Sequence, residues 1–216
     1  METIRDVVAV RGEQELFDRT AHLFERASDI ACAARDLHTW ATSQRQVRHG
    51  GASGAPRDLR IRKIYLPGVL LAPDAAAELA ERVALGARIR ITTAEINETI
   101  LLDGRVAILA GDQSGGVRTY SVLTRPELVQ GISSLFDAAW RSAADLAVYD
   151  ARFAELREQV PRILELLSSG CKDETAARTL GVGLRTYRRW VAELMTALGA
   201  TSRFQAGARA REAGLL

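Results

Sequence analysis

The sequence predicts an α/β (α+β) N-terminal domain with a mixed sheet flanked by helices, followed by a small all-α domain of four helices. Three observations predict this division. Strand-like and helix-like segments alternate up to residue 146, no strand pattern appears beyond residue 156, and glycines divide the C-terminal segment into helical pieces. We therefore expect a first domain at residues 1–146, a linker at residues 147–155 and a second domain at residues 156–216.

The strands of the first domain are short runs of β-branched or alternating residues. One run ends at Pro67-Gly68, and two others flank Asp103-Gly104, as the arms of a hairpin do. The predicted strands are Val7–Val10, Asp29–Trp40, Leu59–Leu66, Arg88–Thr92, Thr99–Leu102, Val106–Ala110 and Val117–Leu123.

The helices of the first domain have apolar residues at helical spacing or a high alanine content. Pro126 in the first turn marks the start of the longest one. The predicted helices are Glu13–Ser28, Ala75–Leu85 and Pro126–Leu146. Residues 44–58 have the composition of a loop.

Four further helices are predicted after residue 156. Thr201 or Ser202 can cap the last of them, and Pro161 must lie in the first turn of its helix or kink it. The predicted helices are Arg157–Ser168, Asp173–Leu180, Leu184–Leu198 and Ser202–Ala213. A short helix, a turn at Gly181 and a second, arginine-rich helix are typical of a helix-turn-helix.

The composition is that of an ordinary globular protein. Of 216 residues, 47% are hydrophobic and 26% are charged, which excludes a disordered chain. No stretch reaches the ~18 uncharged apolar residues of a membrane span. Arg5, Asp6 and Arg11 lie where a signal peptide has its apolar core. We therefore expect a cytoplasmic protein with no membrane partner.

The few cysteines and histidines predict neither a metal nor a cofactor. Cys32 and Cys171 are far apart and lack the CxxC spacing of a zinc site or a disulfide framework. His22, His38 and His49 form no metal-binding spacing with cysteines or carboxylates. We expect the function to be one of binding rather than of metal chemistry.

The basic residues are in excess only in the second domain. Residues 154–216 contain 10 basic and 7 acidic residues, whereas residues 1–153 contain 19 and 20. A charge asymmetry of this kind points to nucleic acid.

The predicted helix at residues 184–198 has one apolar face and one cationic face. The apolar stripe consists of Leu184, Tyr187, Val191, Leu194 and Leu198. The opposite face carries the candidate base contacts, which are Arg185, Arg188, Arg189 and Ala192. Arginine pairs with O6 and N7 of guanine, and a methyl group can contact thymine.

Two further side chains are candidates for contacts with DNA phosphates. Lys172 and Thr186 lie near helix N-termini, whose free N–H groups add positive potential. A solvated arginine face on an ordinary helix is the alternative, but the neighbouring helices and the Gly181 turn favour double-stranded DNA as the partner.

Residues 156–216 resemble the LuxR/FixJ-type helix-turn-helix domain. The resemblance rests on Ile163–Gly170, Ala176–Val182, Arg185–Arg189 and the run Leu198–Ala206, which reads Leu-Gly-Ala-Thr-Ser-Arg-Phe-Gln-Ala. It implies a four-helix DNA-binding domain that acts as a homodimer on two half-sites, with a role in transcription.

Two positions depart from that pattern. Glu174-Thr175-Ala176-Ala177 replaces the usual Lys-Glu-Ile-Ala, so the usual cation is missing and Lys172 substitutes for it in part. Trp190 replaces a usual histidine, and we assign no base contact to it.

Residues 86–110 resemble the core of a phospholipase D-like domain, whose motif is His-x-Lys-x-x-x-x-Asp. Asp103 matches the aspartate, but Ile96 and Glu98 occupy the positions of the nucleophilic histidine and the phosphate-binding lysine. The resemblance implies a degenerate domain without enzymatic activity over residues 1–146. Such a domain serves as a sensor or dimerisation module, with a small-molecule or protein effector.

A phosphoacceptor receiver domain is disfavoured because it needs a lysine after its phosphorylated aspartate, and Lys63 is the only lysine before the linker. A domain that binds an acyl-homoserine lactone is disfavoured because its pocket would be richer in Trp and Tyr than this region. A phospholipase D-type phosphodiesterase or nuclease stays open, as does an adaptor whose C-terminal helices contact proteins instead of DNA.

Overall fold

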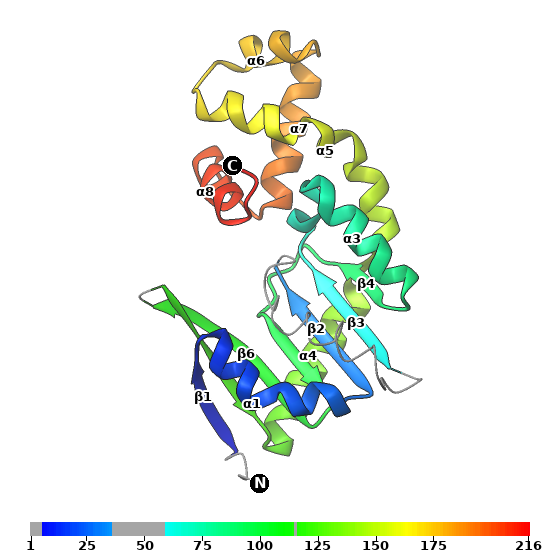
Figure 1. Cartoon of the computed structure of the whole chain (residues 1–216). Helices are drawn as coiled ribbons and strands as arrows, with labels where there is room; N and C mark the ends of the chain where they lie inside the picture. Colours follow the sequence, from blue (N-terminus) through cyan, green and yellow to red (C-terminus); the bar gives the residue numbers. More distant parts are fainter. Residues whose placement is uncertain (1–5, 36–58, 115) are drawn as a thin grey trace.

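A computed structural model describes residues 6–35, 59–114 and 116–216 of the chain (Figure 1). Its strands are β1 (Val7–Arg11), β2 (Asp29–Ala34), β3 (Arg60–Tyr65), β4 (Arg88–Ile91), β5 (Thr99–Leu102), β6 (Val106–Ser114), β7 (Val117–Leu123) and β8 (Ala144–Asp145). Its helices are α1 (Gly12–Arg26), the 3-10 helix η1 (Pro67–Leu71), α3 (Pro73–Ala84), α4 (Pro126–Ser142), α5 (Leu146–Ser168), α6 (Asp173–Leu180), α7 (Leu184–Ala197) and α8 (Arg203–Glu212).

In the described residues, the eight strands form one mixed sheet in the order β1-β7-β6-β5-β2-β3-β4-β8. The pairs β2–β3 and β3–β4 are parallel, and the other neighbours are antiparallel. The parallel pair β3–β4 is joined by η1 and α3, because a parallel connection needs a helical crossover. The predicted mixed sheet is therefore confirmed, and so is the hairpin of β5 and β6.

Helices cover both faces of the sheet (Figure 1). Alternate residues of a strand point to opposite faces. Accordingly, Cys32 of β2 lies in the hydrophobic cluster shared with α1 and α3, whereas Ala31 and Ala33 contact α4 through a second cluster. The helix α4 closes that second face with Phe136 and Trp140. The alanine content of β2 thus leaves room for large side chains of α4.

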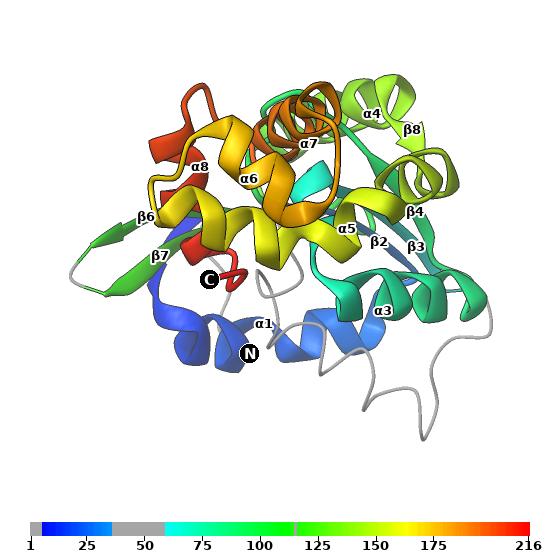
Figure 2. The ribbon, with the colours of Figure 1, turned by 90° about the horizontal axis from the view of Figure 1, so that it is seen from above.

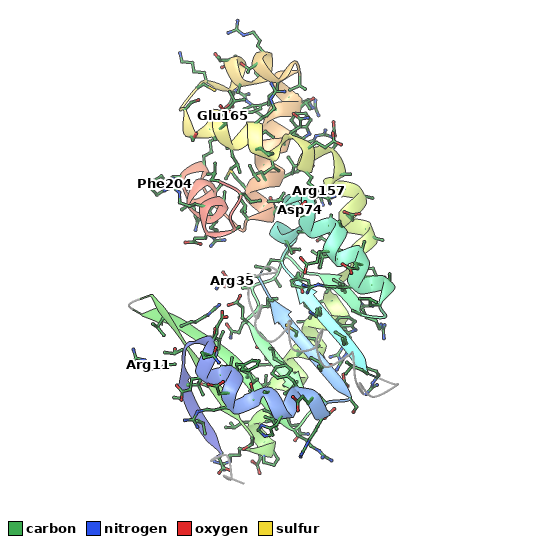
Figure 3. All side chains as sticks on the ribbon, in the orientation of Figure 1. Arg11, Arg35, Asp74, Arg157, Glu165 and Phe204 are labelled. Atoms are coloured by element: carbon green, nitrogen blue, oxygen red, sulfur yellow. The ribbon has the colours of Figure 1, made fainter. Side chains whose placement is uncertain are left out.

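The C-terminal helices α5 to α8 lie beyond one end of the sheet (Figures 1 and 2). The helices α5 and α7 pack on η1. At Gly68 of η1, an added Cβ would lie only 3.1 Å from the carbonyl oxygen of Ala197. Nε of Arg157, labelled in Figure 3, donates a hydrogen bond of 2.6 Å to the carbonyl oxygen of Leu70.

The C-terminal helices share their hydrophobic core with the sheet. Leu70 of η1, Val160 of α5 and Leu194 of α7 belong to the same cluster of buried residues as Ile100 of β5. Helices are present at all four predicted places, and the ends of α6, α7 and α8 are close to those expected, whereas α5 begins earlier. Their packing on η1 means that they do not form a core separate from that of the sheet.

The predicted continuous helix over residues 126–146 was wrong. The helix α4 ends at Ser142, and β8 then pairs with β4. Arg90 of β4 stabilises this break, because Nη1 donates to the carbonyl oxygen of Trp140 (2.6 Å) and Nε contacts Asp145 (3.2 Å). The partner strand lies far away in sequence, so the local pattern did not reveal it.

The start of the next helix was also predicted wrongly. The helix α5 begins at Leu146 rather than at Arg157, so the expected linker at residues 147–155 is helical. Phe153 and Leu156 are buried and stabilise this first half of α5. Pro161 consequently lies in the interior of α5, on its exposed side, and not in a first turn.

The remaining boundaries agree with the prediction to within a few residues. The expected strand at residues 29–40 ends at Ala34 in β2 and Arg35 follows it, whereas residues 36–40 lie outside the described residues, as does the predicted loop at 44–58. None of the described helices combines the length and apolar character that crossing a bilayer requires. The part of the chain that the structure describes contains no group of residues suited to holding a metal ion.

Candidate nucleic-acid interface

A tight turn joins α6 to α7. Gly181 has a φ of +69°, a left-handed conformation that glycine adopts without strain. The N–H of Val182 donates to the carbonyl oxygen of Ala177 at 3.0 Å and ends α6. Three residues later α7 begins at Leu184. This is the connection length of a helix-turn-helix.

The inner face of α7 is buried, as predicted. Tyr187, Val191 and Leu194 lie in the core, while Leu184 is half-buried. Trp190, which was not part of the predicted stripe, is only 4% exposed. Their neighbours in the same cluster come from α5, α6 and α8 and include Ile163, Leu164, Ala176, Ala177, Ala206 and Ala210. The burial of Trp190 agrees with the absence of a base contact there.

The outer face of α7 is open to solvent. All four predicted base contacts are exposed, namely Arg185, Arg188, Arg189 and Ala192. Thr186 is half-buried in the first turn of α7, and Lys172 is the exposed residue directly before α6. An ion pair between Asp173 and Arg188 brings the start of α6 next to this face. Lys172 therefore lies beside the exposed arginines.

Asp173 is the centre of an ion-pair network that sequence reasoning missed. Its side chain is only 14% exposed. The carboxylate accepts two hydrogen bonds from Arg203 of α8 (2.7 and 3.0 Å) and one from Nε of Arg188 (3.1 Å). The Arg203 hydrogen bonds lower the pKa of Asp173; burial opposes this shift, and Arg188 adds to it. The network thus joins α6, α7 and α8 through one carboxylate.

The other arginines of the α7 face differ in their surroundings. Nη2 of Arg189 contacts Glu155 of α5 at 3.3 Å, and Nη2 of Arg188 lies 3.8 Å from Glu174. In the part of the chain that the structure describes, Arg185 makes no ion pair. The face therefore combines one unpaired guanidinium with two that are oriented by carboxylates.

Phe204 of α8, labelled in Figure 3, follows Arg203 of this network, and the residue is 89% exposed. The side chain of Ser202 caps α8 by accepting a hydrogen bond from the N–H of Gln205 (3.2 Å). The predicted cap is thus confirmed at Ser202. The run that carried the LuxR-type resemblance also contains Arg203, and this was the one signal that could have indicated the network.

The positions that correspond to the phospholipase D motif lie at opposite ends of β5. Glu98 precedes the strand, is 4% exposed and forms an ion pair with Arg118 of β7. It also accepts a hydrogen bond from the N–H of Arg35 at 3.3 Å. Ile96 packs against the α4 cluster. A carboxylate and an alkyl group therefore occupy the place where that motif has a lysine and a histidine.

Asp103 stabilises the turn after β5. One of its carboxylate oxygens, Oδ1, accepts hydrogen bonds from the N–H groups of Ser28 and Asp29 and from the hydroxyl of Ser28, at 2.8 to 2.9 Å. Burial alone would raise the pKa of Asp103, but these hydrogen bonds outweigh it and lower that pKa. Asp103 has a φ of +50°, so it serves the turn itself. Its observed contacts are structural.

One curated relative is the "Bialaphos biosynthetic pathway regulatory protein" of Streptomyces hygroscopicus. It is 32% identical over 161 residues, which make up 74% of this chain and 63% of the relative. The chain thus spans less than two thirds of the length of that protein. No protein-family model matches the chain.

Among solved structures, the chain is similar to TrmBL2, an archaeal chromatin protein whose structure is described as showing a novel mode of DNA binding. The TM-score is 0.52 at 15% identity, over 66% of this chain and 55% of TrmBL2. This likeness shows a shared fold over the matched part. Nuc of Salmonella typhimurium, a phospholipase D family member, has a TM-score of 0.46 at 10% identity, over 64% of this chain and 97% of Nuc. That score is too low to establish a shared fold.

Proposed function

We propose that the protein is a sequence-specific DNA-binding transcriptional regulator with a LuxR-type helix-turn-helix formed by α5 to α8. The observation that carries the proposal is the exposed arginine face of α7, on a helix whose other face is buried and which follows a tight turn. A recognition helix presents the residues of its N-terminal half to base edges in the major groove. Arg185, Arg188 and Arg189 all lie in that half of α7.

The ion pairs of this face fit such a role. Asp173 binds Arg188 through Nε, and the structure shows no hydrogen bond from the two terminal nitrogens to a described residue. These are the nitrogens that bind O6 and N7 of guanine. Lys172 and Thr186, at the starts of α6 and α7, are the proposed phosphate contacts. The name of the Streptomyces relative, a regulatory protein, supports the assignment to regulation.

The proposed active form is a homodimer on two half-sites, and the sheet domain is the proposed sensor. We infer that this domain is a degenerate phospholipase D-like module without enzymatic activity. The ion pair of Glu98 with Arg118 supports this view, because a carboxylate at that position repels a phosphate. We propose no cofactor. The contact of η1 with α5 and α7 is a direct physical link from the sheet to the proposed recognition helix.

A footprinting experiment tests the proposal. The full-length protein is incubated with DNA from upstream of its own and neighbouring genes, at two salt concentrations and with random DNA as competitor. We expect two protected half-sites about one helical turn, ~34–36 Å, apart that outlast the competitor. Binding that random DNA removes completely and that vanishes at the higher salt would contradict it and favour the protein-adaptor function.

A further inference from the structure

Two cavities lie on the α4 face of the sheet, at the N-terminal ends of β2, β3 and β4. Their volumes are about 490 and 440 Å³, and both are lined by Asp29, Arg60 and Arg62. Volumes of this size are typical of small-molecule sites. The larger one reaches Asp103 at one end of β5, whereas Ile96 and Glu98 precede the other end of that strand.

The register of the parallel strands brings the charged side chains together. Asp29 of β2 is paired with Arg60 of β3, and Arg62 is paired with Arg88 of β4. These residues share the face that α4 covers, because they alternate with residues that pack on α1 and α3. Three arginines and an aspartate therefore line one stretch of the sheet.

Only part of this positive charge is neutralised within the protein. Arg62 binds Asp137 at 2.8 Å and lies over the rings of Phe136 and Trp140. Arg88 lies 5.7 Å from the centre of the Trp140 ring and makes no ion pair with any described residue. The two linings together contain four arginines and three aspartates, the fourth arginine being Arg105. Their net charge is positive.

Asp29 provides an acceptor without a donor. Its Oδ2 atom takes the ion pairs, at 3.0 Å from Arg60 and 3.9 Å from Arg62. The Oδ1 atom is buried and has no hydrogen-bond partner among the described residues. Buried polar atoms of proteins are nearly always hydrogen-bonded, so an orphaned one points to a missing donor. The cavities thus combine the Arg88 guanidinium, which makes no ion pair with a described residue, and the largely exposed Arg60 with a carboxylate that has one acceptor unused.

We propose that these cavities bind a small phosphorylated molecule that also carries a hydroxyl group. Guanidinium groups bind phosphate through paired, charge-assisted hydrogen bonds, and the phosphate would be held by Arg88 and Arg60. The hydroxyl would donate to the carboxylate of Asp29, whose side chain is partly exposed. This inference rests on the sensor role in the proposed function and gives that sensor its site and the chemical class of its effector.

Calorimetric titration of the full-length protein at low salt tests the site without DNA. The probes are ribose 5-phosphate, glycerol 3-phosphate and glucose 6-phosphate, with ribose and inorganic phosphate as comparisons. We expect at least one sugar or polyol phosphate to bind, with about tenfold weaker binding of ribose and of inorganic phosphate alone. Inorganic phosphate that binds equally well would overturn the role of Asp29.

Matched variants identify the residues. Arg88→Ala and Arg60→Ala should each weaken binding about tenfold, whereas Arg19→Ala, an exposed arginine of α1 on the other face, should bind like the wild type. Thermal unfolding checks that each variant is folded. Unchanged binding by Arg88→Ala, or no heat from any probe up to about 10 mM, would overturn the proposal. Because this titration contains no DNA, its outcome is independent of the footprint.

Discussion

The carboxylate of Asp173 accepts a hydrogen bond from Nε of Arg188 at 3.1 Å, and this contact joins the first residue of α6 to the exposed face of α7. The same carboxylate is held on its other side by Arg203 of α8. Arg188 is therefore held at Nε by a group that is itself fixed. An arginine oriented in this way loses less side-chain entropy when it binds DNA than a free one does.

Replacing Asp173 should reduce sequence discrimination more than affinity. In Asp173→Asn the charge that orients Arg188 is lost, and the repulsion of DNA phosphates falls. We expect the ratio of operator to random-DNA affinity to drop about tenfold, within the ~1–3 kcal/mol of one bidentate base contact. The matched control Glu174→Gln removes a carboxylate that lies 3.8 Å from Arg188, beyond hydrogen-bond distance, and should leave the ratio unchanged. Equal ratios for both variants, measured by competition binding, would contradict this role.

The same network predicts a loss of stability in acid. The hydrogen bonds from Arg203 lower the pKa of Asp173; burial opposes this shift, and Arg188 adds to it. A carboxyl whose folded pKa lies below its unfolded pKa stabilises the protein above the unfolded value, about 3.9 for Asp. That stability is lost as the pH falls below about 4. In urea unfolding, the free energies of unfolding of the wild type and of Asp173→Asn should differ at neutral pH and converge in acid. A difference in the free energy of unfolding that does not change with pH would disprove the contribution of the Asp173 carboxyl.

Substitutions of the α7 arginines and of Lys172 should distinguish contacts with bases from contacts with phosphates. Arg185→Ala, Arg188→Ala and Arg189→Ala should each cost ~1–3 kcal/mol of specific binding without unfolding the protein. Lys172→Ala should weaken binding to all sequences alike and reduce the salt slope by about one. Binding isotherms at several salt concentrations measure both effects. Wild-type affinity in the Arg188 and Arg189 variants would refute the assignment of the groove-facing surface.

The packing of α7 on η1 should be sensitive to a larger side chain at Gly68. Because a Cβ at Gly68 would lie 3.1 Å from the carbonyl oxygen of Ala197, Gly68→Val should destabilise the fold by about 1–3 kcal/mol. Gly131→Ala is the control, since nothing lies within 4 Å of its new Cβ in the middle of α4. That change should stabilise the fold by about 1 kcal/mol. If thermal unfolding shows no loss of stability for Gly68→Val, the contact between η1 and α7 tolerates the larger side chain and the prediction is wrong.

The sheet domain should not cleave phosphodiesters. With Ile96 and Glu98 in place of a nucleophile and a phosphate-binding cation, we expect no hydrolysis of bis(p-nitrophenyl) phosphate in the presence of EDTA. Turnover above the buffer background that is abolished in Glu98→Gln would establish the phosphodiesterase instead. The variant should be checked by circular dichroism, because Glu98 is buried against Arg118.

Elements with strong local patterns were predicted well. Val117–Leu123 forms β7, with the bounds expected, and the hairpin lies around Asp103-Gly104. The apolar stripe and the exposed arginines of α7 were also predicted correctly, because helical spacing alone decides which side chains share a face. The turn at Gly181 was also predicted correctly, because glycine adopts the left-handed φ that ends α6 without strain.

Features that depend on a distant partner were not predicted. The break at Ala144–Asp145 exists because β4 offers Arg90 and an unpaired edge, and α5 begins early because Phe153 finds a buried site. The Asp173–Arg203 pair spans 30 residues, and no local periodicity relates the two segments. Sequence reasoning therefore missed the carboxylate that orients Arg188.

The sequence by itself determined the order of strands and helices apart from η1 and β8, the short turn between α6 and α7 and the set of exposed arginines, because these follow from local propensity and periodicity. Only the tertiary structure decided which arginine each carboxylate binds, that α7 packs on η1, and that Arg60, Arg62 and Arg88 line the same face of the sheet as Asp29. These relationships arise from strand register and helix packing, which bring together residues far apart in the chain.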